Sequence, residues 1–75
     1  MKIKIMEPDD APETQGLSHN YAVLAFTTGS EGKGWYVAWL DGVGDRRDVF
    51  IGGSLAERDQ ALATAQNYFA ANGMN

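Results

Sequence analysis

The sequence predicts a single α+β domain, residues 1–75, in which an antiparallel sheet of three to four strands packs one face against a C-terminal helix. Three observations predict this fold: apolar residues alternate in short segments, Gly-rich turns separate these segments, and an apolar helical repeat follows residue 54. A chain of 75 residues can form one modest core, because at this size only about 60 % of the surface exposed by the unfolded chain becomes buried.

The first strand is predicted over residues 2–6, KIKIM, where Ile3 and Ile5 alternate with Lys2 and Lys4. One side of this strand is therefore apolar and the other is charged. That pattern is typical of a half-buried strand at the edge of a sheet.

The next segment, residues 7–18 (EPDDAPETQGLS), is predicted to be an extended loop. It contains two Pro, one Gly and four carboxylates, and it has too little apolar surface to offset the entropy of ordering. Two interpretations are open: the segment is a solvated linker, or it is an acidic finger that enters a basic groove on a partner. In the second case Asp9, Asp10 and Glu13 are the partner-binding residues.

Three further strands are predicted over residues 20–28, 34–40 and 46–51, which are rich in aromatic and β-branched side chains. The intervening stretches, GSEGKG (29–34) and DGVGD (41–45), supply the Gly residues that tight hairpin connections use. Consecutive strands joined by short turns form an antiparallel meander.

A helix is predicted over residues 55–72. Ser54 and Glu57 have the spacing of a capping box, in which each side chain bonds to the other residue's backbone N–H. An apolar stripe follows, and Gly73 is suited to end the helix. The stripe comprises Leu55, Ala61, Leu62, Ala65, Tyr68 and Phe69.

Residues 34–40, GWYVAWL, are apolar on both faces of the predicted strand, and a single helix can cover only one face. Two arrangements are open. In the first, the helix covers a set that comprises Leu24, Phe26, Tyr36, Leu40 and Phe50. In the second, the helix covers the opposite set, which comprises Tyr21, Val23, Trp35, Val37, Trp39 and Val49. Either uncovered set is larger than a monomer usually exposes, so we expect a second copy of the chain (a homodimer), the 7–18 loop or a partner protein to cover it.

Trp35, Trp39 and Tyr21 are the aromatic candidates for partner binding, since Trp and Tyr are favoured at the centres of protein interfaces. Two alternatives remain for the aromatic strand. The Trp side chains belong to the core, or they stack on the bases of a single-stranded nucleic acid.

Charge and composition disfavour several classes of function. The net charge of −4 argues against non-specific nucleic-acid binding, which needs Lys and Arg to neutralise phosphates. With no Cys and a single His, we expect no metal site, no cofactor and no catalytic residue. Asp41, Asp45 and Asp48 surround one turn, but Arg46 and Arg47 lie among them, which favours local ion pairs and turn-forming Asp over a bound cation.

No stretch has the pattern of a secretory signal or a membrane span, so we expect a cytoplasmic protein with no membrane partner.

In size, acidity and element order, the whole chain resembles small phage-encoded inhibitors of bacterial defence, including anti-CRISPR proteins. This resemblance implies a non-enzymatic protein that occupies a surface of a bacterial nucleic-acid-handling or defence complex, and it assigns no functional residue. In element order alone the chain also resembles short stand-alone bacterial domains of unknown function. The alternative function is such a domain that binds single-stranded nucleic acid through its aromatic sheet face.

Overall fold

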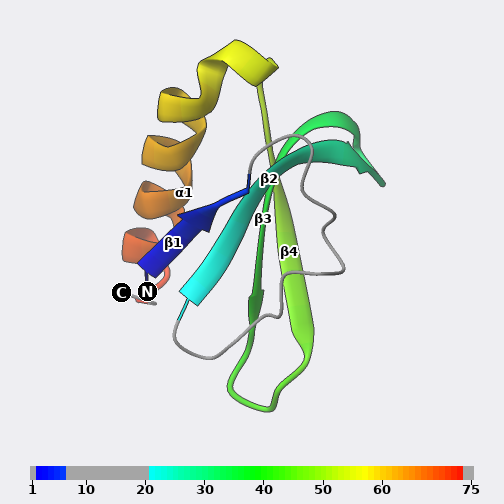
Figure 1. The fold of residues 1–75 in the computed structure, drawn as a ribbon. Coiled ribbons are helices and arrows are strands. Elements are labelled where there is room, and N and C mark those ends of the chain that lie inside the picture. Colours follow the sequence, from blue (N-terminus) through cyan, green and yellow to red (C-terminus); the bar gives the residue numbers. More distant parts are fainter. Residues whose placement is uncertain (1, 7–20, 74–75) are drawn as a thin grey trace.

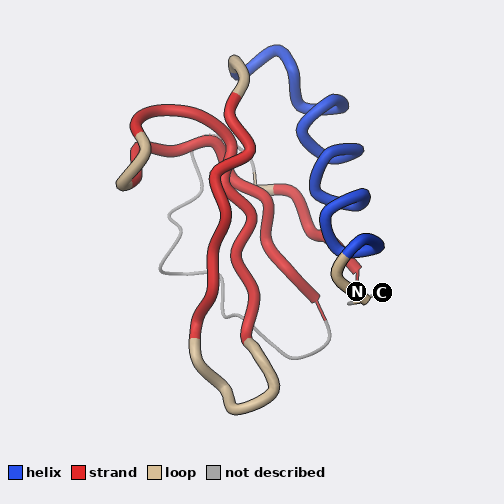
Figure 2. The backbone as a smooth tube through the Cα atoms, turned by 180° about the vertical axis from the view of Figure 1, so that it is seen from behind, coloured by secondary structure: helices blue, strands red, loops and turns tan. Residues whose placement is uncertain are grey.

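The computed structural model describes residues 2–6 and 21–73. Its elements follow in the order β1 (Lys2–Ile5), β2 (Tyr21–Gly29), β3 (Gly32–Leu40), β4 (Arg46–Gly52), the short 3-10 turn η2 (Leu55–Glu57) and the helix α1 (Arg58–Ala71). One layer of strands stands beside α1, as Figures 1 and 2 show from opposite sides. The predicted α+β class, with one C-terminal helix on one face of the sheet, is confirmed.

The four strands lie in the order β1-β2-β3-β4. The pairs β2/β3 and β3/β4 are antiparallel, as a meander requires. The pair β1/β2 is parallel, with Lys2 opposite Tyr21 and Ile5 opposite Leu24, so the sheet is mixed rather than purely antiparallel. A parallel pair needs a crossover of about a dozen residues or more, and the long stretch between β1 and β2 provides that length.

The first hairpin is tighter than predicted. Strands β2 and β3 continue through Gly29 and from Gly32, so the turn consists of Ser30 and Glu31 and not of the whole GSEGKG stretch. Gly32 has a φ of +107°, a conformation that L side chains rarely adopt and that lets the chain reverse within so few residues.

The capping box is present at the start of the helical segment. The backbone N–H of Ser54 donates to Oε1 of Glu57 at 2.7 Å, and the Ser54 side chain is paired with the backbone of Glu57. The first turn is 3-10 rather than α-helical, and Leu55 within it is exposed, which corrects its predicted place in the apolar stripe. At the other end Gly73 has a φ of +69°, as expected of the residue that terminates a helix.

The core lies between α1 and one face of the sheet. The helix contributes Ala61, Ala65 and Phe69, and the strands contribute a buried set that includes both Trp side chains. That set is Ala22, Leu24, Trp35, Val37 and Trp39.

Strand register corrects both of the expected face assignments. Leu24 lies opposite Val37, and Phe26 lies opposite Trp35, so these four side chains share the helix-facing side. The assignment from the sequence had placed Leu24 and Phe26 with Tyr36, but Tyr36 pairs with Ala25 on the side away from α1. Alternation within one strand tells which residues share a face, whereas pairing between strands depends on register, and a shift of one residue exchanges the faces.

We call the side of the sheet away from α1 the second face. Its described side chains include Lys2, Lys4, Tyr21, Val23, Ala25, Thr27, Tyr36, Ala38, Leu40, Arg46, Asp48 and Phe50. Three of these, Val23, Tyr36 and Ala38, are buried. Within residues 2–6 and 21–73, no helix is long and apolar enough to cross a membrane.

Candidate functional site

Trp35 and Trp39 are core side chains in this structure, with 1 % and 6 % of their surfaces exposed. The indole N–H of Trp35 donates to the Ser54 carbonyl at 2.7 Å, and the Trp39 ring packs edge-on against Phe69 with centroids 5.2 Å apart. Both rings therefore join the sheet to the helical segment. This is the core alternative, and it corrects the expectation that the two Trp side chains present a surface to a partner.

Of the other predicted partner-binding residues, Tyr21 lies on the second face at the start of β2. The Lys4 ammonium lies 5.5 Å from its ring centroid, close enough for a cation–π interaction. Asp9, Asp10 and Glu13, with the whole 7–18 loop, lie outside the described residues.

A hollow of about 460 Å³ opens beside the tip of the β2–β3 hairpin. This tip projects away from α1 (Figure 2). The hollow is lined by Ser30, Glu31, Tyr36, Asp48, Val49 and Phe50. It combines two aromatic side chains with two carboxylates, and no sequence pattern had singled it out.

Two Gly residues make room for the aromatic side chains of this hollow. A Cβ atom at Gly29 would lie 2.6 Å from Cζ of Tyr36, and one at Gly34 would lie 2.8 Å from Cε1 of Phe50. The rings therefore lie directly on bare backbone, with their centroids 4.9 Å apart. No local pattern in the sequence could have identified this site, because the two Gly residues meet the two rings only through strand pairing.

The Tyr36 hydroxyl closes the hairpin tip. It donates to the Gly32 carbonyl at 2.7 Å and accepts from the backbone N–H of Glu31 at 3.1 Å. The phenol end is thus fully engaged while its ring supports Phe50. These bonds fix the backbone of Glu31, which is one of the residues that line the hollow.

Phe50 is the exposed member of the aromatic pair, with 40 % of its surface accessible. Nearby, Asp48 forms an ion pair with Arg46 at 3.4 Å, and both of these side chains are exposed. Such exposed pairs contribute little to stability, so the Asp48 carboxylate can exchange partners at small cost. Chemically, the hollow can receive an apolar or a cationic group.

The turn between β3 and β4 is organised by Asp41 and leaves little room for a cation site. Its Oδ1 accepts from the backbone N–H groups of Val43 and Asp45, both at 3.0 Å, and its Oδ2 accepts from Nε of Arg47 at 2.9 Å. The hydrogen bond from Arg47 is the main reason that the pKa of Asp41 lies below its usual value. The predicted turn-forming Asp and local ion pairs are confirmed. In the described part of the chain, no group of three or more His, Cys, Asp or Glu could hold a metal ion.

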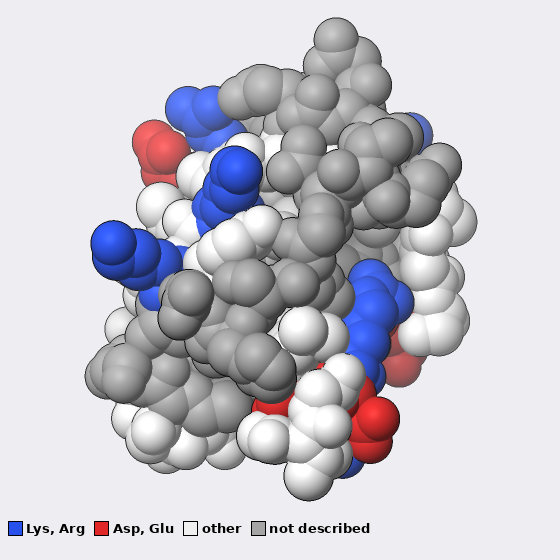
Figure 3. Space-filling view, turned by 60° about the horizontal axis from the view of Figure 1, so that its bottom comes forward, with Lys and Arg blue, Asp and Glu red and all other residues white. Residues whose placement is uncertain are grey.

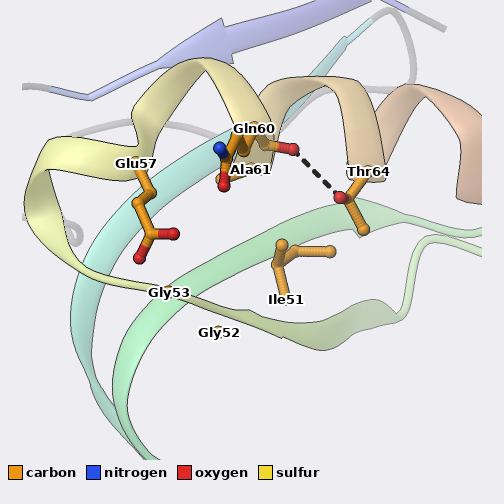
Figure 4. Close-up of a pocket in the computed structure, with 7 residues that line it drawn as sticks. All are labelled: Ile51, Gly52, Gly53, Glu57, Gln60, Ala61 and Thr64. Carbon is orange, nitrogen blue, oxygen red and sulfur yellow. Dashed lines mark hydrogen bonds between the residues drawn. The ribbon is translucent and has the colours of Figure 1, made fainter.

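A second, smaller cavity of about 100 Å³ lies between β4 and the start of the helix (Figure 4). Its polar groups already have structural roles. The backbone N–H of Ser54 donates to the Glu57 carboxylate and holds the pKa of Glu57 below its usual value. The Thr64 hydroxyl donates to the Gln60 carbonyl at 2.9 Å. Two polar side chains that line this cavity, those of Glu57 and Thr64, are thus engaged in the helical segment itself.

Charge is mixed over the described surface. On the face seen in Figure 3, Lys and Arg side chains (blue) and Asp and Glu side chains (red) lie in several places rather than in one patch of a single sign. No patch of a single charge therefore marks a binding surface on the described part of this face.

Comparison with known proteins adds no relative to this geometry. No family model matches the chain, and neither the curated proteins nor the solved structures include a significant match. The functional argument accordingly starts from the hollow and its residues.

Proposed function

We propose that this protein is a small non-enzymatic module that binds another protein through the second face of its sheet. The observation that carries the proposal is the exposure of Phe50 beside a ready-formed hollow at the hairpin end of the second face, whose central side chains Val23, Tyr36 and Ala38 are buried. Exposed aromatic side chains in preformed depressions are typical anchors of protein interfaces.

The rigidity of the hollow supports this role. The Tyr36 hydroxyl bonds and the close approach of the rings to Gly29 and Gly34 order the aromatic part of the hollow before binding. A surface that is already ordered loses less entropy on binding, which favours affinity.

The proposed partner is a bacterial protein or complex of the nucleic-acid-handling or defence type, as the resemblance to phage-encoded inhibitors implies. In this proposal the acidic residues Asp9, Asp10 and Glu13 supply complementary charge against a basic surface that normally holds nucleic acid. A homodimer formed through the second face is the competing arrangement.

The proposal is tested by affinity capture from a bacterial lysate with three forms of the tagged protein: wild type, Phe50→Ser and Val43→Ser. Val43 is the most exposed large apolar residue among those that the structure describes, and it lies at the β3–β4 turn. Its replacement therefore serves as a control that removes exposed apolar surface elsewhere. We expect a captured protein to remain with Val43→Ser and to be lost with Phe50→Ser, while circular dichroism shows that both variants are folded.

Capture that is unaffected by Phe50→Ser would exclude this surface as the interface. Light scattering on the purified wild type tests the homodimer. A dimer that becomes monomeric in Phe50→Ser would assign the second face to self-association instead. Charge reversal at Asp9 and Asp10 tests the contribution of the acidic segment to the same complex.

A further inference from the structure

We propose that the hollow beside the hairpin tip receives an arginine side chain of the partner protein, with the guanidinium stacked on Phe50 and bonded to the carboxylates of Glu31 and Asp48. This inference rests on the proposed function and names the group that the surface recognises.

The lining of the hollow favours a cation over an apolar group. Glu31 and Asp48 come from different parts of the sheet, the β2–β3 turn and β4, and both border the space beside the Phe50 ring. A cation between them meets two negative charges and the negative face of an aromatic ring. A purely apolar guest would instead remove carboxylates from water without compensation. The net charge of −4 adds a weaker attraction of the same sign.

Arginine fits this arrangement better than lysine. A guanidinium is planar, so it can stack on the exposed face of Phe50 while its N–H groups point outward to carboxylates. An ammonium is a compact, strongly hydrated charge without a planar face, so it gains less from an aromatic ring and forms no paired hydrogen bonds with a carboxylate. We therefore expect the site to discriminate between the two cations.

One of the two carboxylates of the proposed site already forms an ion pair within the chain. Arg46 pairs with Asp48 at 3.4 Å, whereas Glu31 forms no ion pair among the described residues. A partner's arginine must therefore share or displace Arg46 at Asp48, whereas at Glu31 it meets no competing cation from the described part of the chain. Removal of the Arg46 charge should accordingly strengthen binding, since it frees the Asp48 carboxylate and removes a like charge.

The experiment is an NMR titration of the full chain at low salt with three capped tripeptides that differ only at the centre, Ac-Gly-Arg-Gly-NH2, its lysine analogue and its citrulline analogue. Citrulline keeps the shape of arginine without the charge. We expect the arginine peptide to shift the Glu31 amide and the Phe50 ring signals, the lysine peptide to shift them less, and the citrulline peptide to leave them unchanged.

Single substitutions in the chain show where the arginine peptide binds. We expect Glu31→Gln to weaken the arginine peptide roughly two- to fivefold, the range for an exposed ion pair, and Arg46→Gln to strengthen it. The Glu31→Gln change leaves in place the backbone N–H that bonds to Tyr36. Asp59→Asn, at an exposed helix carboxylate, removes the same charge elsewhere and should change the affinity little.

Several results would overturn the inference: no shift around the hollow, equal shifts with the citrulline peptide, or equal weakening by Asp59→Asn and Glu31→Gln. If the arginine peptide binds more weakly to the Arg46→Gln variant than to wild type, Asp48 is excluded as an acceptor for the guanidinium. If the peptide fails while partner capture still depends on Phe50, the arginine site is wrong and the protein-binding function stands. If the peptide binds but Phe50→Ser leaves capture intact, the site exists but is not the interface.

Discussion

Replacement of Tyr36 by Phe removes one oxygen atom and keeps the ring that supports Phe50. The lost hydroxyl makes two hydrogen bonds, to the Gly32 carbonyl at 2.7 Å and from the Glu31 N–H at 3.1 Å. A protein hydrogen bond contributes about 0.5–1.5 kcal/mol net, and water can reach these groups at the hairpin tip. We therefore expect Tyr36→Phe to lower the free energy of unfolding by about 1–2 kcal/mol, toward the lower end of the sum.

The assay is urea unfolding followed by Trp fluorescence, since both Trp side chains are buried. The slope of the free energy against urea should stay constant, because the surface exposed on unfolding does not change. Amide hydrogen exchange should become faster at Glu31, the donor that loses its partner. Tyr68→Phe is the control, because its hydroxyl makes no hydrogen bond among the described residues. Equal stability of the two variants, or unchanged exchange at Glu31, would refute the argument that the hydroxyl holds the tip.

Three further predictions concern the sheet, the core and the β3–β4 turn. Gly34→Ala places a methyl group 2.8 Å from the Phe50 ring and 3.2 Å from the backbone of Gly52, so it should lower the free energy of unfolding by about 1–2 kcal/mol and shift the NMR signals of the Phe50 ring. Gly42→Ala is the control and should not shift these signals, because the space around its Cβ is open. Trp35→Phe removes a buried indole and its hydrogen bond, and we expect a loss of about 2–3 kcal/mol in urea unfolding; a loss below about 0.5 kcal/mol would contradict its place in the core. The pKa of Asp41 is lowered in the folded protein. Its contribution to the free energy of unfolding is therefore present above the ordinary pKa of 3.8 and is lost as the pH falls through the lower pKa of the folded state. Acid titration of stability should therefore be steeper for wild type than for Asp41→Asn below about pH 4, and parallel curves would show that Asp41 is not the responsible group.

The two Trp side chains illustrate a limit of reasoning from residue type. Trp is enriched at the centres of interfaces, but it is also the side chain with the most apolar area to bury in a small core. In this chain the helix contributes only Ala61, Ala65 and Phe69 as fully buried groups, and two of these are small. Large rings from β3 therefore fill the space that small helix residues leave. Phe50 is the exposed aromatic side chain that remains for a partner. It lies on β4, a strand in which the sequence had indicated no partner-binding residue.

The sequence by itself determined the elements. Alternation identified the strands, the Ser54–Glu57 spacing identified the start of the helical segment, and Gly73 marked its end, because each of these signals acts between residues close in the chain. Only the tertiary structure decided what depends on contacts between distant residues. Register placed Trp35 with Phe26 and Tyr36 with Phe50, and β1 paired with β2 in parallel. The hollow around Phe50 belongs to this second group, since it exists only when Gly29, Gly34 and the two rings are brought together by strand pairing.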